Sequence, residues 1–161
     1  MNAKKTKTIG ILSDTHGLLR PEVEKALAGC DHILHAGDVG DNQVLERLAR
    51  IAPVTAVRGN MDYGSWSNAL PVTEMVEIDT VFFYILHDLQ RLDLDPVAAG
   101  IHVVVSGHTH RPELTRRNGV FYLNPGSAGQ RRYDDPVSMA RVPIENGQPT
   151  PRIIEIDLYQ P

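Results

Sequence analysis

The chain has 161 residues, of which 42% are hydrophobic and 22% are charged, with a formal net charge of −4. This length and composition predict one globular domain, residues 1–161. The sequence contains no apolar run near the ~20 residues that a membrane helix needs. The acidic balance argues against strong binding to nucleic acid through its phosphates. The single cysteine, Cys30, cannot form an intrachain disulfide, so a reducing cytoplasm is expected. A homo-oligomer is compatible with all of these features.

The first third of the chain alternates between short apolar strands and helices. Three strands are predicted, at Thr8–Ser13, His32–Ala36 and Val54–Val57. Of the two helices between them, the first begins at Pro21 and ends near Gly29. The second covers Gln43–Arg50, with Asn42 as its N-cap. This order is typical of a parallel sheet with right-handed crossovers.

The rest of the chain is richer in strands. A surface loop anchored by Trp66 is predicted over Tyr63–Pro71. Further strands are predicted at Thr73–Ile78, Val81–Leu86, Val103–Ser106, Glu113–Arg117, Val120–Asn124, Val137–Val142 and Arg152–Asp157. Asn118-Gly119 is typical of a type I′ hairpin turn, and this half is expected to be mostly antiparallel. The predicted fold class is α/β, with two stacked mixed β-sheets flanked by helices.

Side chains with nitrogen or oxygen donors follow five of these predicted strands. They are Asp14 with His16, Asp38, Asn60, His87, and His108 with His110. In open α/β sheets the loops at the carboxyl ends of the strands form the site, so these side chains are expected to converge. Seven donors suit two metal ions about 3.5–4 Å apart with one bridging carboxylate. The absence of a thiolate favours Mn, Fe, Zn, Ni or Co over a structural zinc site.

Each of these residues also has an ordinary structural explanation. Asp14 and Asp38 could cap a turn or helix, and Asn60 follows a glycine, as many turn residues do. His87 could simply be hydrogen-bonded at a strand end. Five such strand ends in register are harder to explain by packing alone. His35 lies close to Asp38 and is predicted to orient a ligand carboxylate rather than to bind metal itself.

The order of these motifs resembles that of the calcineurin-like metallophosphoesterases, and within them the small prokaryotic YfcE-like phosphodiesterases. The motifs that carry the resemblance are Asp14-x-His16, Gly37-Asp38, Gly59-Asn60-x-Asp62, His87, Gly107-His108-Thr109-His110 and Asn124-Pro125-Gly126-Ser127. The resemblance implies a four-layer sandwich with helices outside two stacked sheets. It also implies a cytoplasmic hydrolase that acts on a small phosphate ester, with manganese as the favoured metal.

The resemblance implies a role for each motif residue. The first metal ion would be held by Asp14, His16 and His110, and the second by Asn60, His87 and His108. Asp38 would bridge the two ions, and Asp62 would support the ligands from behind. The implied reaction is in-line attack on phosphorus by a hydroxide that bridges the ions, next to Asp38, Asn60 and His108. Independently of the resemblance, Arg58 and Arg111 are candidates for contact with the phosphate, and surface or salt-bridge roles explain them equally well.

Two departures from the family pattern bear on the chemistry. Met61 stands where larger relatives carry a histidine, and Asp88 stands where a glycine often follows the ligand histidine. A thioether cannot donate a proton, so diesters and good leaving groups are expected to be favoured.

Three other functions compete with this interpretation. The main alternative is a non-catalytic protein-binding scaffold of the same fold, as in the retromer complex. The complete donor set favours the enzyme, because a scaffold has no need of it. A nuclease acting on long DNA is disfavoured by the acidic balance. A dinucleotide-binding domain is excluded because no Gly-x-Gly-x-x-Gly loop follows the first strand.

Overall fold

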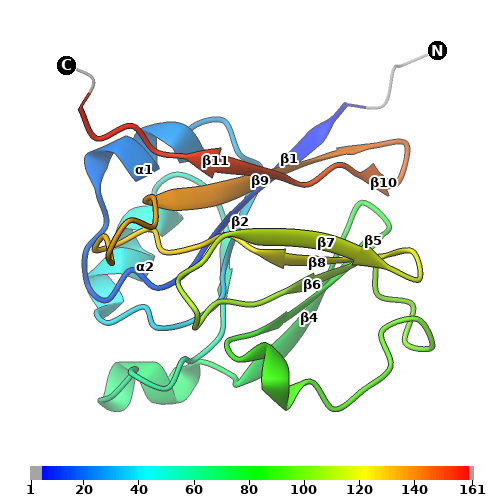
Figure 1. Ribbon diagram of the computed structural model, residues 1–161, viewed down its shortest axis with the longest axis horizontal. Coiled ribbons are helices and arrows are strands. Elements are labelled where there is room, and N and C mark those ends of the chain that lie inside the picture. The colour runs from blue at the N-terminus through cyan, green and yellow to red at the C-terminus, as the bar shows by residue number, and fades with distance from the viewer. Residues whose placement is uncertain (1–4, 160–161) are drawn as a thin grey trace.

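Two stacked β-sheets organise residues 5–159, the part of the chain that the computed structural model describes (Figure 1). The first sheet has the strand order β10-β9-β1-β2-β3, with β11 also paired to β9. The second has the order β4-β5-β6-β8-β7. Both sheets are mixed, which confirms the predicted fold class. Residues 1–4 and 160–161 of the predicted domain lie outside the described part.

The first sheet is built on a parallel β-α-β-α-β unit. Its strands are β1 (Lys7–Leu12), β2 (His32–His35), β3 (Val54–Ala56), β9 (Ser138–Glu145), β10 (Gln148–Pro149) and β11 (Arg152–Glu155). The crossover helices are α1 (Pro21–Leu27) and α2 (Asn42–Ala49). The N-cap of α2 is Asp41, whose carboxylate accepts a hydrogen bond from the Gln43 N–H at 2.8 Å. The prediction of Asn42 as the cap is therefore wrong by one residue.

The second sheet combines two hairpins with a parallel centre. Its strands are β4 (Thr73–Ile78), β5 (Val81–Leu86), β6 (Val103–Val105), β7 (Glu113–Arg117) and β8 (Val120–Asn124). The β7–β8 hairpin turns at Asn118-Gly119, both with positive φ, as a type I′ turn requires. However, β6 pairs in parallel with both β5 and β8. The expectation of a mostly antiparallel half is confirmed by the pairings of β4 with β5, of β7 with β8 and of β9 with its neighbours. Strand β6 is the exception, because the hairpin places β8 rather than β7 beside it.

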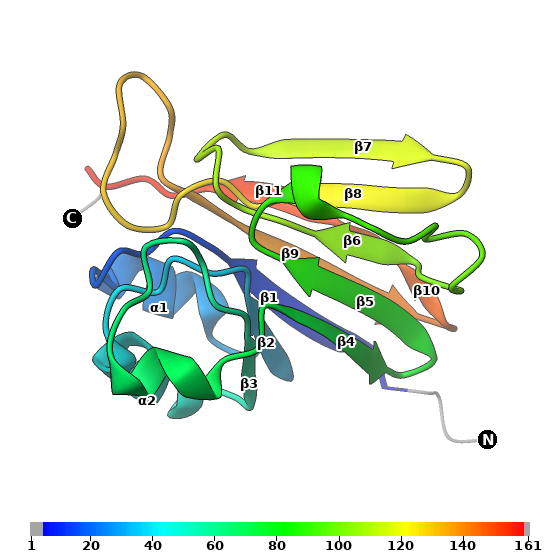
Figure 2. The same cartoon turned by 90° about the horizontal axis from the view of Figure 1, so that it is seen from below.

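The core has one layer between the sheets and one beneath the helices. Ile9, Ile11 and Leu34 of the first sheet pack against Phe83 and Ile85 of the second. Alternate residues of β1 and β2 face the other way, toward α1 and α2, which cover the outer side of the first sheet in Figure 2. The sheets are thereby held with the carboxyl ends of β1, β2, β3, β5 and β6 at one edge.

The outer face of the second sheet is covered without an α-helix. Tyr84 and Val104 pack there against Leu89 and Leu92, which belong to the irregular segment 88–101 and its 3-10 turn η2 (Leu89–Arg91). This segment covers the second sheet on the side where the implied four-layer sandwich would have helices, so the implied helical layer on that side is corrected. None of the described helices is long and apolar enough to cross a membrane.

The predicted loop Tyr63–Pro71 contains a 3-10 turn, η1 (Ser65–Ala69). Trp66 within it packs against the cluster beneath the helices, in the anchoring role expected of it. Ser67 is buried and bonds to two carbonyls of the same loop. The turn follows the loop that carries Asn60 and Asp62, and the hydrogen bond from Ser67 to Asp62 O holds the end of that loop in place.

Candidate metal centre

The loops that follow β1, β2, β5 and β6 are hydrogen-bonded to one another through their backbones. The Asp14 N–H donates to Gly37 O and the His16 N–H to Asp38 O, both at 3.0 Å. Within the second sheet, the Gly107 N–H donates to His87 O at 2.9 Å, and across the sheets the His108 N–H donates to the Asp14 carboxylate at 3.1 Å. The strand ends therefore converge on one small volume, as the sequence predicts.

Five of the seven predicted ligands have a left-handed backbone. These are Asp14, His16, Asp38, His108 and His110, with φ between 45° and 74°. Residues other than glycine adopt this region rarely, at a cost on the order of 1 kcal/mol each. Such clustering is typical of functional sites, where the surrounding structure holds strained residues in place.

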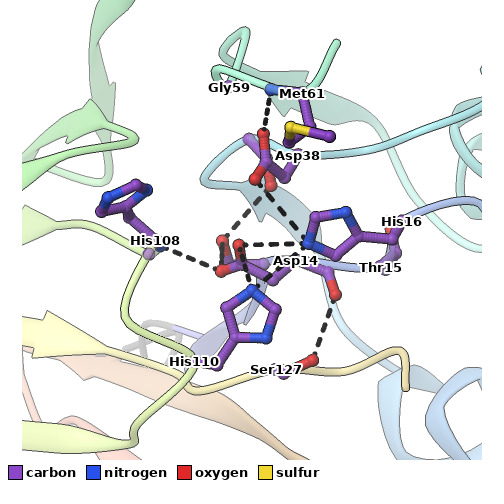
Figure 3. Close-up of polar contacts among 12 residues, drawn as sticks. Asp14, Thr15, His16, Asp38, Gly59, Met61, His108, His110 and Ser127 are labelled. Atoms are coloured by element: carbon purple, nitrogen blue, oxygen red, sulfur yellow. Dashed lines mark hydrogen bonds and ion pairs between the residues drawn. The ribbon is translucent and has the colours of Figure 1, made fainter. Parts of the chain in front are cut away.

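Both carboxylates have one oxygen fixed by donors and one oxygen facing imidazoles. Asp14 Oδ2 accepts a hydrogen bond from the Ser13 hydroxyl at 2.7 Å. It accepts another from the His108 N–H at 3.1 Å, which Figure 3 shows. Asp38 Oδ1 accepts one from the Met61 N–H at 2.8 Å. The remaining oxygens, Asp14 Oδ1 and Asp38 Oδ2, point toward the histidines.

Three imidazoles surround these two free oxygens. His110 Nε2 lies 3.3 Å from Asp14 Oδ1, and His87 Nε2 lies 3.1 Å from Asp38 Oδ2. His16 Nε2 lies between them, 3.8 Å from Asp14 Oδ1 and 3.7 Å from Asp38 Oδ2. The result is two overlapping groups of candidate ligands, Asp14–His16–His110 and Asp14–Asp38–His87.

The donors in these groups fit divalent cations. Asp14 Oδ1 and His87 Nε2 are buried without a hydrogen-bond partner among the described residues, and they lie 3.9 Å apart. Buried polar atoms rarely remain unpaired, and a cation would satisfy both. Asp14 belongs to both groups, while Asp38 Oδ2 faces both His16 and His87. Either carboxylate is thus placed to bridge, although the sequence prediction named Asp38 alone.

Asn60 and His108 lie on the exposed rim of the cluster. Their side chains contact each other, with Asn60 Oδ1 at 3.2 Å from His108 Nδ1. The His108 ring also meets the His87 ring edge-on at a centroid distance of 5.2 Å. His108 thus lies beside the second group but outside both groups, and Asn60 contacts its ring.

His35 and Asp62 hold the loops behind the cluster. The Asp62 carboxylate accepts hydrogen bonds from the N–H groups of Gly59 and Gly40, at 2.9 and 2.8 Å. His35 Nδ1 accepts from the Gly37 N–H, so its Nε2–H donates to the Thr15 hydroxyl at 3.0 Å. The prediction that His35 orients a ligand carboxylate is wrong, because both of its ring nitrogens bond elsewhere. His35 instead ties the β1 loop to the β2 loop through backbone and hydroxyl groups.

The free oxygens of the carboxylates stay ionised because their neighbours outweigh burial. Burial alone would raise the pKa of Asp14, but the neighbouring imidazoles of His110 and His87 lower it. At Asp38, burial is likewise outweighed by the adjacent His87 imidazole and by the hydrogen bond from the Met61 N–H, so its pKa is also lowered. Conversely, Asp38 and Asp14 raise the pKa of His87 against its burial. The ionised carboxylate is the form that binds metal ions.

His35 makes the stability of the metal-free protein depend on pH. Burial lowers its pKa from 6.5 to about 4, although the charges of Asp14 and Asp38 act in the opposite direction. Between pH 6.5 and about pH 4, this histidine is therefore protonated in the unfolded chain but neutral in the folded protein. We expect this histidine to remove up to about 3 kcal/mol from the free energy of unfolding over that interval.

Urea unfolding of chelator-treated wild type and His35→Gln, at several pH values between 4.5 and 7, measures this effect. The glutamine keeps an N–H for Thr15 and does not titrate, so the variant is expected to lose less stability as the pH falls. Parallel pH profiles for the two proteins would contradict it.

Two supporting residues escaped the sequence analysis. The Ser13 hydroxyl donates to the Asp14 carboxylate, and the Thr15 hydroxyl accepts from His35. Both lie next to a motif residue, but small polar residues at strand ends are common, so the sequence carried no distinguishing signal. Asn124 was named as part of a motif without a role, and its Nδ2 donates to Gly107 O at 2.9 Å and thus fixes the β6 loop.

Two motif glycines are required by close packing around the carboxylates. A Cβ on Gly107 would clash with the Ser13 hydroxyl and stand 2.7 Å from Asp14 Oδ2. A Cβ on Gly59 would overlap the backbone and carboxylate of Asp38. These glycines allow the β3 and β6 loops to approach the acidic residues.

This chain belongs to the calcineurin-like phosphoesterase superfamily, whose domain model matches residues 8–147. It is 38% identical over 135 residues to a probable metallophosphoesterase of Methanocaldococcus jannaschii, covering 76% of this chain and 68% of that protein. It is 30% identical over 155 residues to phosphodiesterase YfcE of Escherichia coli, covering 78% and 82% of the two chains. The resemblance drawn from the motifs is thereby confirmed.

Solved structures share the whole fold. A predicted phosphoesterase of Streptococcus pneumoniae aligns with a TM-score of 0.73 at 23% identity, covering 98% of this chain and 96% of the other. Vacuolar Protein Sorting 29 of Cryptosporidium parvum aligns with a TM-score of 0.76 at 21% identity, covering 96% and 100%. At these identities the likeness concerns the fold alone.

Proposed function

We propose that this protein is a metal-dependent phosphodiesterase that holds two divalent ions, with manganese favoured over Fe, Zn, Ni or Co. The observation that carries the proposal is the pair of carboxylate oxygens, Asp14 Oδ1 and Asp38 Oδ2, that face three imidazole nitrogens. Membership of the phosphoesterase superfamily and relatives named phosphodiesterases support it. His16 and His110 would serve the first ion, and His87 with Asn60 and His108 the second.

The reaction would be hydrolysis of a P–O ester bond. Bound divalent ions would lower the pKa of water and place positive charge beside the phosphoryl oxygens. The oxygen of water forms a bond to phosphorus, the ester P–O bond breaks, and the leaving oxygen takes the bonding electron pair and finally a proton. Asn60 and His108, on the exposed rim, are placed to contact phosphoryl oxygens as charge develops there.

Hydrolysis of a panel of phosphomonoesters, diesters and cyclic nucleotides by manganese-loaded protein tests the proposal. We expect aryl diesters to be cleaved, with the activity lost on chelation and restored by added metal. A chelator-insensitive activity, or none on any diester by fully loaded protein, would refute the proposed function.

A scaffold without catalysis is the second candidate, and the near-complete overlap with Vacuolar Protein Sorting 29 favours considering it. The donor set argues for the enzyme, since buried unpaired atoms such as Asp14 Oδ1 destabilise a protein that binds no metal. Metal binding without hydrolysis of any ester in the panel would support the scaffold.

The role proposed for His87 can be separated from that of the first ion. His87→Ala removes an imidazole from the Asp14–Asp38–His87 group and leaves the Asp14–His16–His110 group intact. We expect activity to fall by at least about 10-fold at limiting metal and to recover in part at high metal concentration. Metal content and rates measured across a manganese titration provide the test. Wild-type activity at limiting metal would show that His87 has only a structural role.

A further inference from the structure

Two cavities meet at the exposed rim of the metal centre. The first, with a volume of about 690 Å³, is lined by Arg58, Tyr84 and Arg91 beside Asn60. The second, of about 420 Å³, lies over β7 and β8 beneath the 3-10 turn η2. Asp88 and His108 line both cavities. The two cavities thus form one groove with His108 at its middle.

The first cavity offers an apolar floor and balanced charge. Tyr84 and Leu86 belong to the outer face of the second sheet and form part of its wall. Its two arginines, Arg58 and Arg91, are matched by two carboxylates, Asp88 and Asp93. Because no net charge remains, the cavity does not select for a second phosphate on its occupant.

The second cavity is lined mainly by neutral hydrogen-bonding groups. Gln90, Ser106 and Thr115 contribute amide and hydroxyl groups. The Arg117 guanidinium is stacked 4.4 Å from the centre of the Tyr122 ring, and Glu113 is the acidic group on the same strand. This lining also fits a polar, uncharged organic group.

We propose that the physiological substrate is a phosphodiester whose two ester groups are both sizeable, polar and uncharged. One group occupies each cavity, with the phosphorus between them beside His108. This inference rests on the proposed phosphodiesterase function. Both volumes fall in the ~300–1,000 Å³ range of cavities that enclose small organic molecules, so each cavity accommodates a complete ester group.

Matched threonine-to-phenylalanine substitutions test whether both cavities are used. Thr115→Phe fills the second cavity, and Thr73→Phe fills the first. Leu114→Phe is the control, because Leu114 lies on the same strand as Thr115 but outside either lining. Each protein is loaded with manganese and assayed with bis(para-nitrophenyl) phosphate and with methyl para-nitrophenyl phosphate, whose methyl group needs no cavity.

We expect both cavity-filling variants to raise KM for the diaryl ester about tenfold, the effect of ~1.4 kcal/mol of lost binding. Only one of them, the variant that fills the cavity of the leaving aryl group, is expected to raise KM for the methyl ester. Leu114→Phe is expected to change neither. If Thr115→Phe does not fold by circular dichroism, Gln90→Trp narrows the same cavity from η2.

The outcomes separate this inference from the proposed function. If wild type cleaves neither ester, the phosphodiesterase function itself fails. If wild type cleaves both, and either cavity-filling variant leaves KM for the diaryl ester unchanged, the two-cavity inference is wrong. A rise in KM for the methyl ester with both variants would also overturn the inference, because a substrate with a single aryl group should use only one of the two cavities.

Discussion

Asp14→Asn is expected to lose both metal ions and to lower kcat/KM for an aryl diester by more than about 10²-fold. Mutation of a residue that only supports a ligand already lowers metal affinity or activity about 10–100-fold. Asp14 belongs to both candidate ligand groups, and its Oδ1 is a buried oxygen without a hydrogen-bond partner in the described structure. An amide removes the negative charge that attracts the cations. Metal analysis by mass spectrometry and kinetics on the purified variant measure both effects.

Asp41→Asn is the matched control for this variant. Asp41 caps α2 outside the metal centre, and asparagine is an equally good cap, so stability and activity should be retained. Asp38→Asn is expected to behave like Asp14→Asn, because Asp38 Oδ2 faces both His16 and His87. If either site variant retains two full equivalents of metal, that residue is not a bridging ligand.

Met61→His is expected to increase turnover of alkyl monoesters far more than that of aryl diesters. Met61 is 49% exposed, and its N–H donates to the Asp38 carboxylate (Figure 3), so residue 61 lies at the edge of the metal centre. A basic alkoxide leaving group gains most from a proton donor, whose contribution is worth up to about 10²–10⁴-fold. A phenolate leaves readily without one. The ratio of kcat/KM for the two esters in each protein is the measurement.

Met75→His provides the control, since Met75 is 41% exposed on β4 and belongs to neither ligand group. A Met61→His protein with normal metal content and an unchanged ratio would rule out the missing proton donor. Substrate preference would then depend on the shape of the cavities.

The chain pattern predicted the strands of the second sheet and the convergence of the loops, but not the parallel pairing of β6. Strand ends are marked by glycine followed by a donor, as at Gly37-Asp38 and Gly107-His108, and parallel strands bring such ends together wherever the sheet forms. The pairing of β6 with β8 depends on how a hairpin docks against a distant strand. Local sequence carries little information about that long-range choice.

The supporting contacts were equally hard to predict. His35 was expected beside a carboxylate because of its position near Asp38, yet its ring bonds to Thr15 and Gly37. Side-chain direction on β2 is set by packing between the sheets, and a residue two positions from a loop can reach several acceptors. Motifs therefore identified which loops meet, while the hydrogen bonds that hold those loops depend on the folded backbone.

The most direct test of the two-ion centre is anomalous diffraction from crystals of the manganese-loaded protein. We expect two peaks about 3.5–4 Å apart. One should lie among Asp14, His16 and His110, and the other beside Asp38 and His87, with Asn60 and His108 turned toward it. A single peak, or none, in crystals grown with saturating manganese would contradict the two-ion centre on which the proposed function depends.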